Sequence, residues 1–93
     1  MSNLRQRVER GAAMLDKKRR SPAWRGKIDL ETLAIEDGCR CVLGQLYGNY
    51  VKGEERLGLI TDADKAIHLG LVTWAQNPRP LTRAWVRYIE ATR

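Results

Sequence analysis

The sequence predicts an all-α protein, a small single-domain helical bundle with three main helices and several short ones. Segments at about 2–20, 38–51 and 81–91 each place apolar residues three or four positions apart, which is the spacing of one helix face. No useful length of chain alternates apolar and polar residues as a half-buried strand does, although 69–74 is where a short strand would fit best. A chain of 93 residues supports one core, so residues 1–93 are expected to form one domain.

The first element is a basic helix at about 2–20. Its apolar stripe consists of Leu4, Val8, Ala12 and Leu15. On a helical wheel the basic side chains Arg7, Arg10, Lys17 and Lys18 gather on an adjoining face. Arg5 and Glu9 lie on the other flank, where they form an i,i+4 pair.

Two short elements are expected next. Ser21 is a good N-cap and Pro22 a good first-turn residue, so a short turn should carry Trp24 toward the core. Asp29 could cap a second short helix over residues 29–36.

The most regular apolar pattern predicts a central helix at about 38–51. Its stripe consists of Cys39, Val42, Leu43, Leu46 and Tyr50. This stripe places Cys39 in the core and Cys41 off it. Gly44 and Gly48 reduce helix propensity, so they indicate a neighbouring backbone at close range.

The last third of the chain begins with a polar link at 52–56. Thr61 and Asp64 resemble a capping box, which predicts a short helix over 62–69 that ends at Gly70 and has Ala63, Ala66 and Ile67 inward. Residues 77–80, with two prolines, cannot continue a helix. The C-terminal helix at about 81–91 has an apolar stripe of Leu81, Ala84, Trp85, Tyr88 and Ile89.

Charge is segregated along the chain. The formal net charge is +6, and the first 27 residues hold nine Lys or Arg against two acidic residues, a net of +7, while the remainder is close to neutral. Such a local positive field attracts phosphates or an acidic protein surface.

No catalytic or metal-binding constellation is recognisable, so we expect no enzyme, no metal and no cofactor. Serine occurs only at positions 2 and 21, and no phosphate-binding glycine loop is present. Cys39 and Cys41 would point about 200° apart on a helix, and with His68 they supply one ligand fewer than zinc needs. His68 is better explained by the dipole at a helix C-terminus.

The aromatic residues divide into two groups. Trp24, Tyr50 and Trp85 are expected in the core, whereas Tyr47 and Trp74 are candidates for exposed contacts.

No run approaches 18 apolar residues, and residues 1–10 are polar and basic, unlike a signal peptide. Two cysteines are too few for a disulfide scaffold. We therefore expect a cytoplasmic protein without a membrane partner.

Residues 38–48 (GCRCVLGQLYG), together with the Trp24 turn and residues 28–33, resemble a set of small proteins of unknown function encoded by actinobacteria and their phages. Residues 81–85 are similar too, so the resemblance covers most of the chain. It carries no known activity or site. It implies a phage or prophage accessory protein, made in the host cytoplasm, that acts by binding one host component.

The leading hypothesis is a non-enzymatic protein that binds a host or phage macromolecule, with an acidic protein preferred. The alternative is sequence-tolerant DNA or RNA binding by the same face, which would weaken steeply with salt. A basic face that only keeps the protein soluble also fits the sequence, and size makes a homodimer plausible. The predicted partner- or phosphate-binding residues are Arg7, Arg10, Lys17, Lys18, Arg19 and Arg20.

Overall fold

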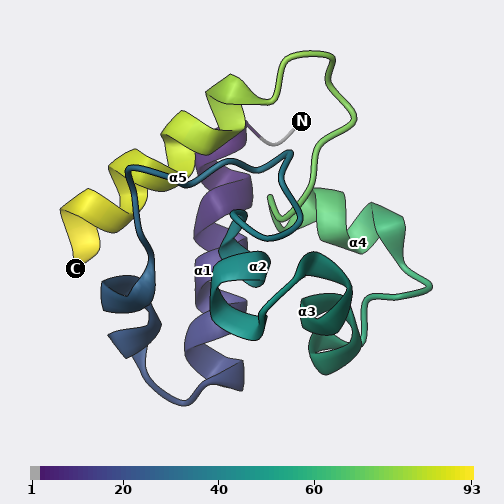
Figure 1. Ribbon diagram of the computed structural model, residues 1–93, viewed down its shortest axis with the longest axis horizontal. Coiled ribbons are helices and arrows are strands. Elements are labelled where there is room, and N and C mark those ends of the chain that lie inside the picture. The colour runs from purple at the N-terminus through teal and green to yellow at the C-terminus, as the bar shows by residue number, and fades with distance from the viewer. Residues whose placement is uncertain (1–2) are drawn as a thin grey trace.

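The computed structural model describes residues 3–93 and contains six helical segments and no strand in that range. They are α1 (Leu4–Lys18), the 3₁₀ helix η1 (Pro22–Lys27), α2 (Val42–Tyr47), α3 (Tyr50–Leu57), α4 (Ala63–His68) and α5 (Arg79–Thr92). The predicted all-α fold of one small domain is confirmed. Figure 1 shows α1 through the middle of the molecule, with α5 crossing its N-terminal half and α2 in front of its C-terminal half.

Helix α1 begins with a capping box. The Asn3 side chain accepts a hydrogen bond from the Gln6 backbone N–H, and the Gln6 side chain accepts one from the Asn3 N–H. The helix ends at Lys18, and Arg20 beyond it has a left-handed φ of 56°. Helix α1 is thus shorter than the predicted 2–20, and residue 2 lies outside the described residues.

The predicted turn after α1 is confirmed. Ser21 Oγ accepts a hydrogen bond from the Ala23 N–H at 3.1 Å, Pro22 opens η1, and Trp24 is buried. The short helix predicted over 29–36 is wrong. There the Gln45 side chain bonds both the N–H and the carbonyl of Asp29, which satisfies this backbone without a helix.

The predicted central helix at 38–51 is also wrong, because two helices stand in its place. Gly48 has φ 99°, a conformation that ends α2, and Asn49 caps α3. The carbonyl of Gly38 lies against the α carbon of Gly44 and accepts the Tyr50 N–H at 2.7 Å. A close neighbour is therefore confirmed at Gly44, whereas Gly48 serves the helix end.

This break reverses the predicted roles of the two cysteines. Cys41 is 1% exposed and caps α2 with its sulfur, which accepts the Gly44 N–H at 3.2 Å, while Cys39 is exposed. Burial raises the pKa of the Cys41 thiol, although hydrogen bonds from backbone N–H groups oppose the shift. Cys41 is thus a protonated structural cap.

In the last third of the chain, several helix boundaries and caps differ from those predicted. Residues 52–56, predicted as a link, belong to α3. Asp62 caps α4 in place of Thr61, Ala66 is buried and Ala63 is exposed. Helix α5 begins two residues before the predicted start, because Pro80 fits in its first turn.

The core gathers the apolar stripes of α1 and α5 around two tryptophans. Trp24 and Trp85 meet edge to face with ring centroids 6.3 Å apart, and the Trp85 indole N–H donates to the Gly70 carbonyl at 2.7 Å. Both are buried, as predicted, and Tyr50 is half-buried. Trp74 is exposed, as the sequence predicted, and its side chain is accessible for a contact.

Candidate functional site

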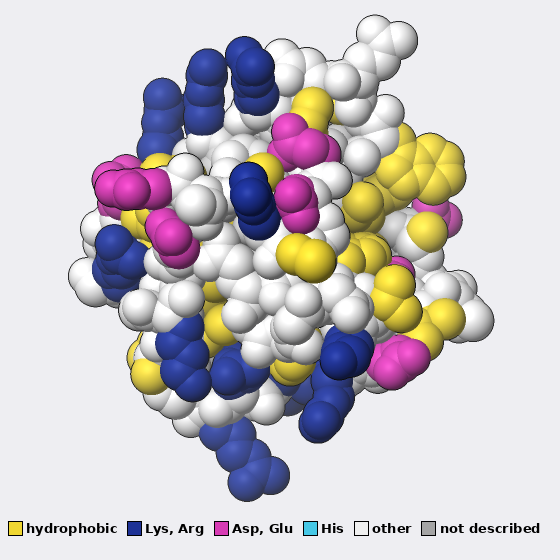
Figure 2. All heavy atoms as spheres, viewed as in Figure 1, with side chains coloured by type: hydrophobic (Ala, Val, Ile, Leu, Met, Phe, Trp, Pro, Cys, Tyr) yellow, Lys and Arg dark blue, Asp and Glu magenta, His cyan; other side chains and the backbone are white. Residues whose placement is uncertain are grey.

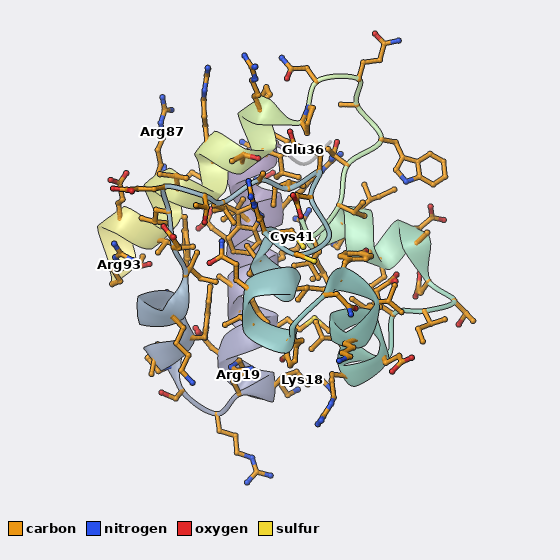
Figure 3. The ribbon with its side chains drawn as sticks, in the orientation of Figure 1. Lys18, Arg19, Glu36, Cys41, Arg87 and Arg93 are labelled. Atoms are coloured by element: carbon orange, nitrogen blue, oxygen red, sulfur yellow. The ribbon has the colours of Figure 1, made fainter. Side chains whose placement is uncertain are left out.

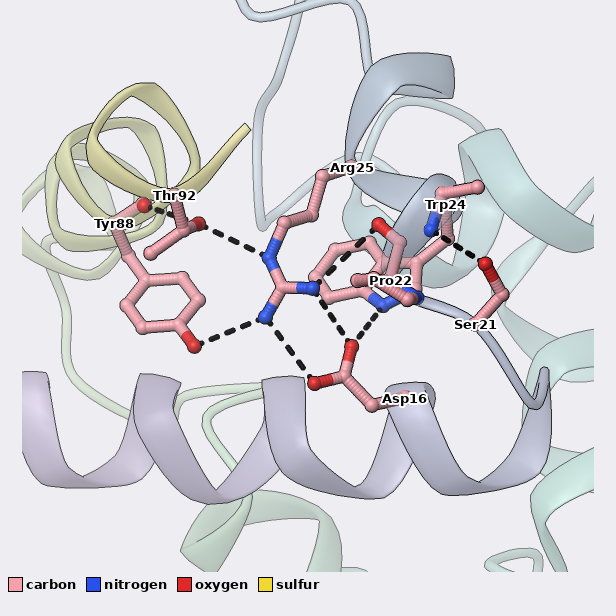
Figure 4. Close-up of polar contacts among 8 residues, drawn as sticks. Asp16, Ser21, Pro22, Trp24, Arg25, Tyr88 and Thr92 are labelled. Carbon is pink, nitrogen blue, oxygen red and sulfur yellow. Dashed lines mark hydrogen bonds and ion pairs between the residues drawn. The ribbon is translucent and has the colours of Figure 1, made fainter.

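One basic residue of the N-terminal segment is buried and committed to the fold. Arg25 is 6% exposed and joins η1 to α1 and α5 (Figure 4). Its guanidinium donates to both carboxylate oxygens of Asp16, at 2.8 and 3.3 Å, to Thr92 Oγ1 at 3.0 Å and to the Tyr88 hydroxyl at 3.1 Å. It also lies 4.8 Å from the centroid of the Trp24 ring.

The electrostatics of this network favour the charged pair. Burial acts to raise the pKa of Asp16, but hydrogen bonds from Arg25 and Trp24 and the charge of Arg25 outweigh it and lower the pKa. Burial likewise acts to lower the pKa of Arg25, and its hydrogen bonds to Asp16 and Tyr88 raise it. Arg25 and Asp16 therefore neutralise each other and contribute no free charge to a binding surface.

The six predicted binding residues do not form one face. Arg7 and Arg10 are half-buried on the side of α1 that contacts α4. Arg10 Nε donates to the His68 carbonyl at 3.1 Å, and the backbone of Arg7 lies against Gly70. These two arginines serve the packing of α4 on α1.

The other four predicted residues lie at the opposite end of α1. Lys17, Lys18 and Arg20 are exposed, and Arg19 is half-buried with its guanidinium 5.3 Å from the centroid of the Tyr47 ring. Figure 3 shows Lys18 and Arg19 together at the lower edge of the molecule. The structure thus separates these four residues from Arg7 and Arg10, and it brings Lys18 and Arg19 to one cavity.

Two of these residues, Lys18 and Arg19, share a cavity with Arg56 of α3, and Lys52 of α3 lines a neighbouring hollow. Lys18, Arg19, Tyr47, Arg56 and Leu57 line a cavity of about 350 Å³ that contains no carboxylate. A second hollow of about 500 Å³, lined in part by Tyr47, Lys52, Glu55 and Arg56, adjoins it. We call the six basic residues of this region the cationic end: Lys17, Lys18, Arg19, Arg20, Lys52 and Arg56.

No ion pair within residues 3–93 involves any residue of the cationic end. Figure 2 shows Lys and Arg side chains gathered along the lower part of this view, with an acidic side chain beside them at the lower right. Lys18, Arg19 and Arg56 share a cavity without a carboxylate, so their fields add there and favour the approach of an anionic group. Glu55 lines the adjoining hollow beside Lys52 and Arg56.

Sequence reasoning missed Lys52 and Arg56, because residues 52–56 were predicted to be a link. Asparagine is a strong N-cap residue, and the Asn49 side chain accepts the Lys52 backbone N–H. An asparagine directly before Tyr50 is therefore the signal that could have revealed the start of α3. Tyr47, predicted as a possible exposed contact, is half-buried and lines the cavity.

Within residues 3–93 no three His, Cys, Asp or Glu side chains lie close enough together to hold a metal ion. In the same range, none of the helices has the length and apolar character needed to span a membrane.

No family model, no curated protein and no solved structure matches this chain.

Proposed function

We propose that this protein is a non-enzymatic interaction protein that binds an acidic protein partner through its cationic end. The observation that carries the proposal is the cavity at which Lys18 and Arg19 of the α1 terminus converge with Arg56 of α3, with no carboxylate in its lining. The resemblance to phage-type proteins would make the partner a host or phage protein.

The surroundings of Tyr47 favour protein over nucleic acid. A base bound by stacking needs an open aromatic face, and Arg19 already lies over the Tyr47 ring. The half-buried Leu46 and the buried Leu57 beside the cations add apolar lining that suits a folded protein surface better than a sugar-phosphate backbone. Carboxylates of a partner would form charge-assisted hydrogen bonds with Lys18, Arg19 and Arg56.

Fluorescence anisotropy tests the proposal, with a labelled polypeptide rich in Asp and Glu and with labelled duplex DNA and single-stranded RNA of similar charge. We expect the acidic polypeptide to bind, and the double variant Lys18→Glu/Arg56→Glu to lose at least about ten-fold in affinity. The matched control is Lys27→Glu/Lys65→Glu, which changes the net charge equally at two exposed positions outside the cationic end.

Equal losses in the two double variants would mean that only net charge matters, and would refute the assignment to the cationic end. Tighter binding of the nucleic acids, with an affinity that falls steeply with salt, would replace the acidic partner by DNA or RNA.

A further inference from the structure

A second surface lies at the other end of α1, where its first turn meets α5. It forms a groove of about 830 Å³. Its apolar lining includes Leu4 from α1 and Ala84, Tyr88 and Ala91 from α5. The three α5 residues are four and three positions apart and so lie along one stripe of the helix. Two of them are alanines, which leaves room above the stripe.

Arginines stand on both sides of this groove. Arg83 and Arg87 lie one helical turn apart on α5, and Arg5 faces them from α1. Within residues 3–93 neither Arg83 nor Arg87 forms an ion pair. Arg5 pairs with Glu9 at 3.8 Å, but its side chain is 86% exposed, so that pair is weak and easily exchanged.

The arginines on the α5 side of the groove are visible on the surface. Figure 2 shows a row of Lys and Arg side chains over α5, and Figure 3 labels Arg87 in that row, pointing away from the body.

The floor of the groove is fixed by the buried network behind it. The Tyr88 hydroxyl and Thr92 Oγ1, both from groove residues, accept hydrogen bonds from Arg25. Thr92 Oγ1 also donates to the Tyr88 carbonyl at 2.7 Å. A partner that binds here therefore meets a preorganised surface and loses little affinity to ordering it.

We propose that this groove binds an acidic amphipathic helix of a partner protein. The apolar stripe takes the apolar face of such a helix, in the helix-in-groove mode of recognition. Arg83 and Arg87, one turn apart, match carboxylates spaced one turn apart on the incoming helix. Helix α5 has 14 residues, which gives about 21 Å of length and room for about four turns of partner helix.

This inference stands on a different surface from the proposed function and does not depend on it. The cationic end presents Lys18, Arg19 and Arg56 around a small cavity, whereas the groove combines three arginines with an apolar floor. Apolar lining adds nothing to the binding of a sugar-phosphate backbone, so the groove favours a protein segment.

The test uses labelled peptides of about 18 residues, long enough for five helical turns. The first places Leu on one face and Glu in i,i+4 pairs beside it. The second has the same composition in an order that scatters the Leu residues, and the third replaces every Glu by Lys. We expect the first peptide to bind at least about ten-fold more tightly than either of the others.

Two protein variants locate the binding. Arg83→Glu/Arg87→Glu reverses the charges, and Ala91→Trp fills the groove at an exposed position. Each should weaken the first peptide at least about ten-fold, while the matched control Lys27→Glu/Lys65→Glu, at exposed positions outside the groove, should change its affinity less than about three-fold. Circular dichroism checks that each variant keeps its helix content.

Amide chemical shifts of the unmodified protein provide a readout that needs no variant. The first peptide should shift residues of α5 and of the first turn of α1. Shifts confined to Lys17–Arg20 and α3, or equal binding of the shuffled peptide, would overturn the groove assignment. A homodimer detected by sedimentation and abolished by Arg83→Glu/Arg87→Glu would also overturn it, because the groove would then hold a second copy of this chain.

Discussion

The pair α1 and α5 differs from the pair α2 and α3 in what holds its members together. Helices α1 and α5 have 15 and 14 residues, and a side-chain network joins them through Arg25, which lies 63 and 67 positions before its α5 partners Tyr88 and Thr92. Helices α2 and α3 have six and eight residues, and backbone geometry at Gly44 and Gly48 sets their positions. Long-range side-chain contacts therefore organise one half, and local backbone contacts organise the other.

The largest effect on the stability of the protein is expected when the Arg25 network is broken. Arg25→Met should lower the free energy of unfolding by about 2–4 kcal/mol, because it leaves Asp16, Tyr88 and Thr92 without their shared donor. Urea denaturation measures the change. The double variant Asp16→Asn/Arg25→Met should be more stable than Arg25→Met alone, since it leaves no unpaired charge. A double variant less stable than the single one would contradict this account of the network.

In the pair α2 and α3, the substitution expected to reduce stability most is at the close backbone contact of Gly44. Gly44→Ala would place a methyl group against the Gly38 carbonyl and the Cys39 backbone, so we expect a loss of about 1–3 kcal/mol on thermal or urea unfolding. Gly26→Ala is the matched control, because an added methyl group there meets no atom within 4 Å. Similar losses at both glycines would show that the close approach at Gly44 has no energetic consequence.

The sulfur cap of α2 should have a smaller effect. Cys41→Ala removes the acceptor of the Gly44 N–H, and we expect it to cost about 1 kcal/mol. Cys39→Ala, at an exposed position, should be close to neutral. A thiol reagent applied to the folded protein should modify Cys39 first and reach Cys41 only on unfolding. Equal reaction rates would contradict the burial of Cys41.

The smallest effect is a pH dependence. The pKa of Asp16 is lower in the folded than in the unfolded protein, so its contribution to stability is present above the unfolded value of about 3.9 and disappears as the pH falls through the folded value. Urea midpoints measured from about pH 5 down to about pH 2 should fall less steeply for Asp16→Asn than for the unmodified protein. Identical slopes would mean that the network does not shift the Asp16 carboxylate.

The same difference explains what the sequence could predict of the fold. Helices α1 and α5 each have one uninterrupted apolar stripe, so periodicity located them to within two residues at their described ends. Leu46 and Tyr50 keep helical spacing across the break at Gly48, so periodicity alone could not separate α2 from α3. Nor could it show that the Gln45 side chain would satisfy the backbone near Asp29.

The candidate site was predictable to a similar extent. A helical wheel places Arg7 and Arg10 beside Lys17, but it cannot show that α4 covers the first two. Lys18 and Arg19 were predicted from the charge run. Arg56 was not, because its convergence with them depends on the position of α3, which only the tertiary structure fixes.

The edge-to-face pair of Trp24 and Trp85 has an optical consequence. Two indoles with centroids 6.3 Å apart couple their electronic transitions, so they should give a strong near-ultraviolet circular dichroism signal only when η1 is seated on α5. The exposed Trp74 does not take part in that contact, and Trp74→Phe would remove its own contribution to the near-ultraviolet signal. The near-ultraviolet signal of the protein would then report directly whether its 3₁₀ helix is packed against its last helix.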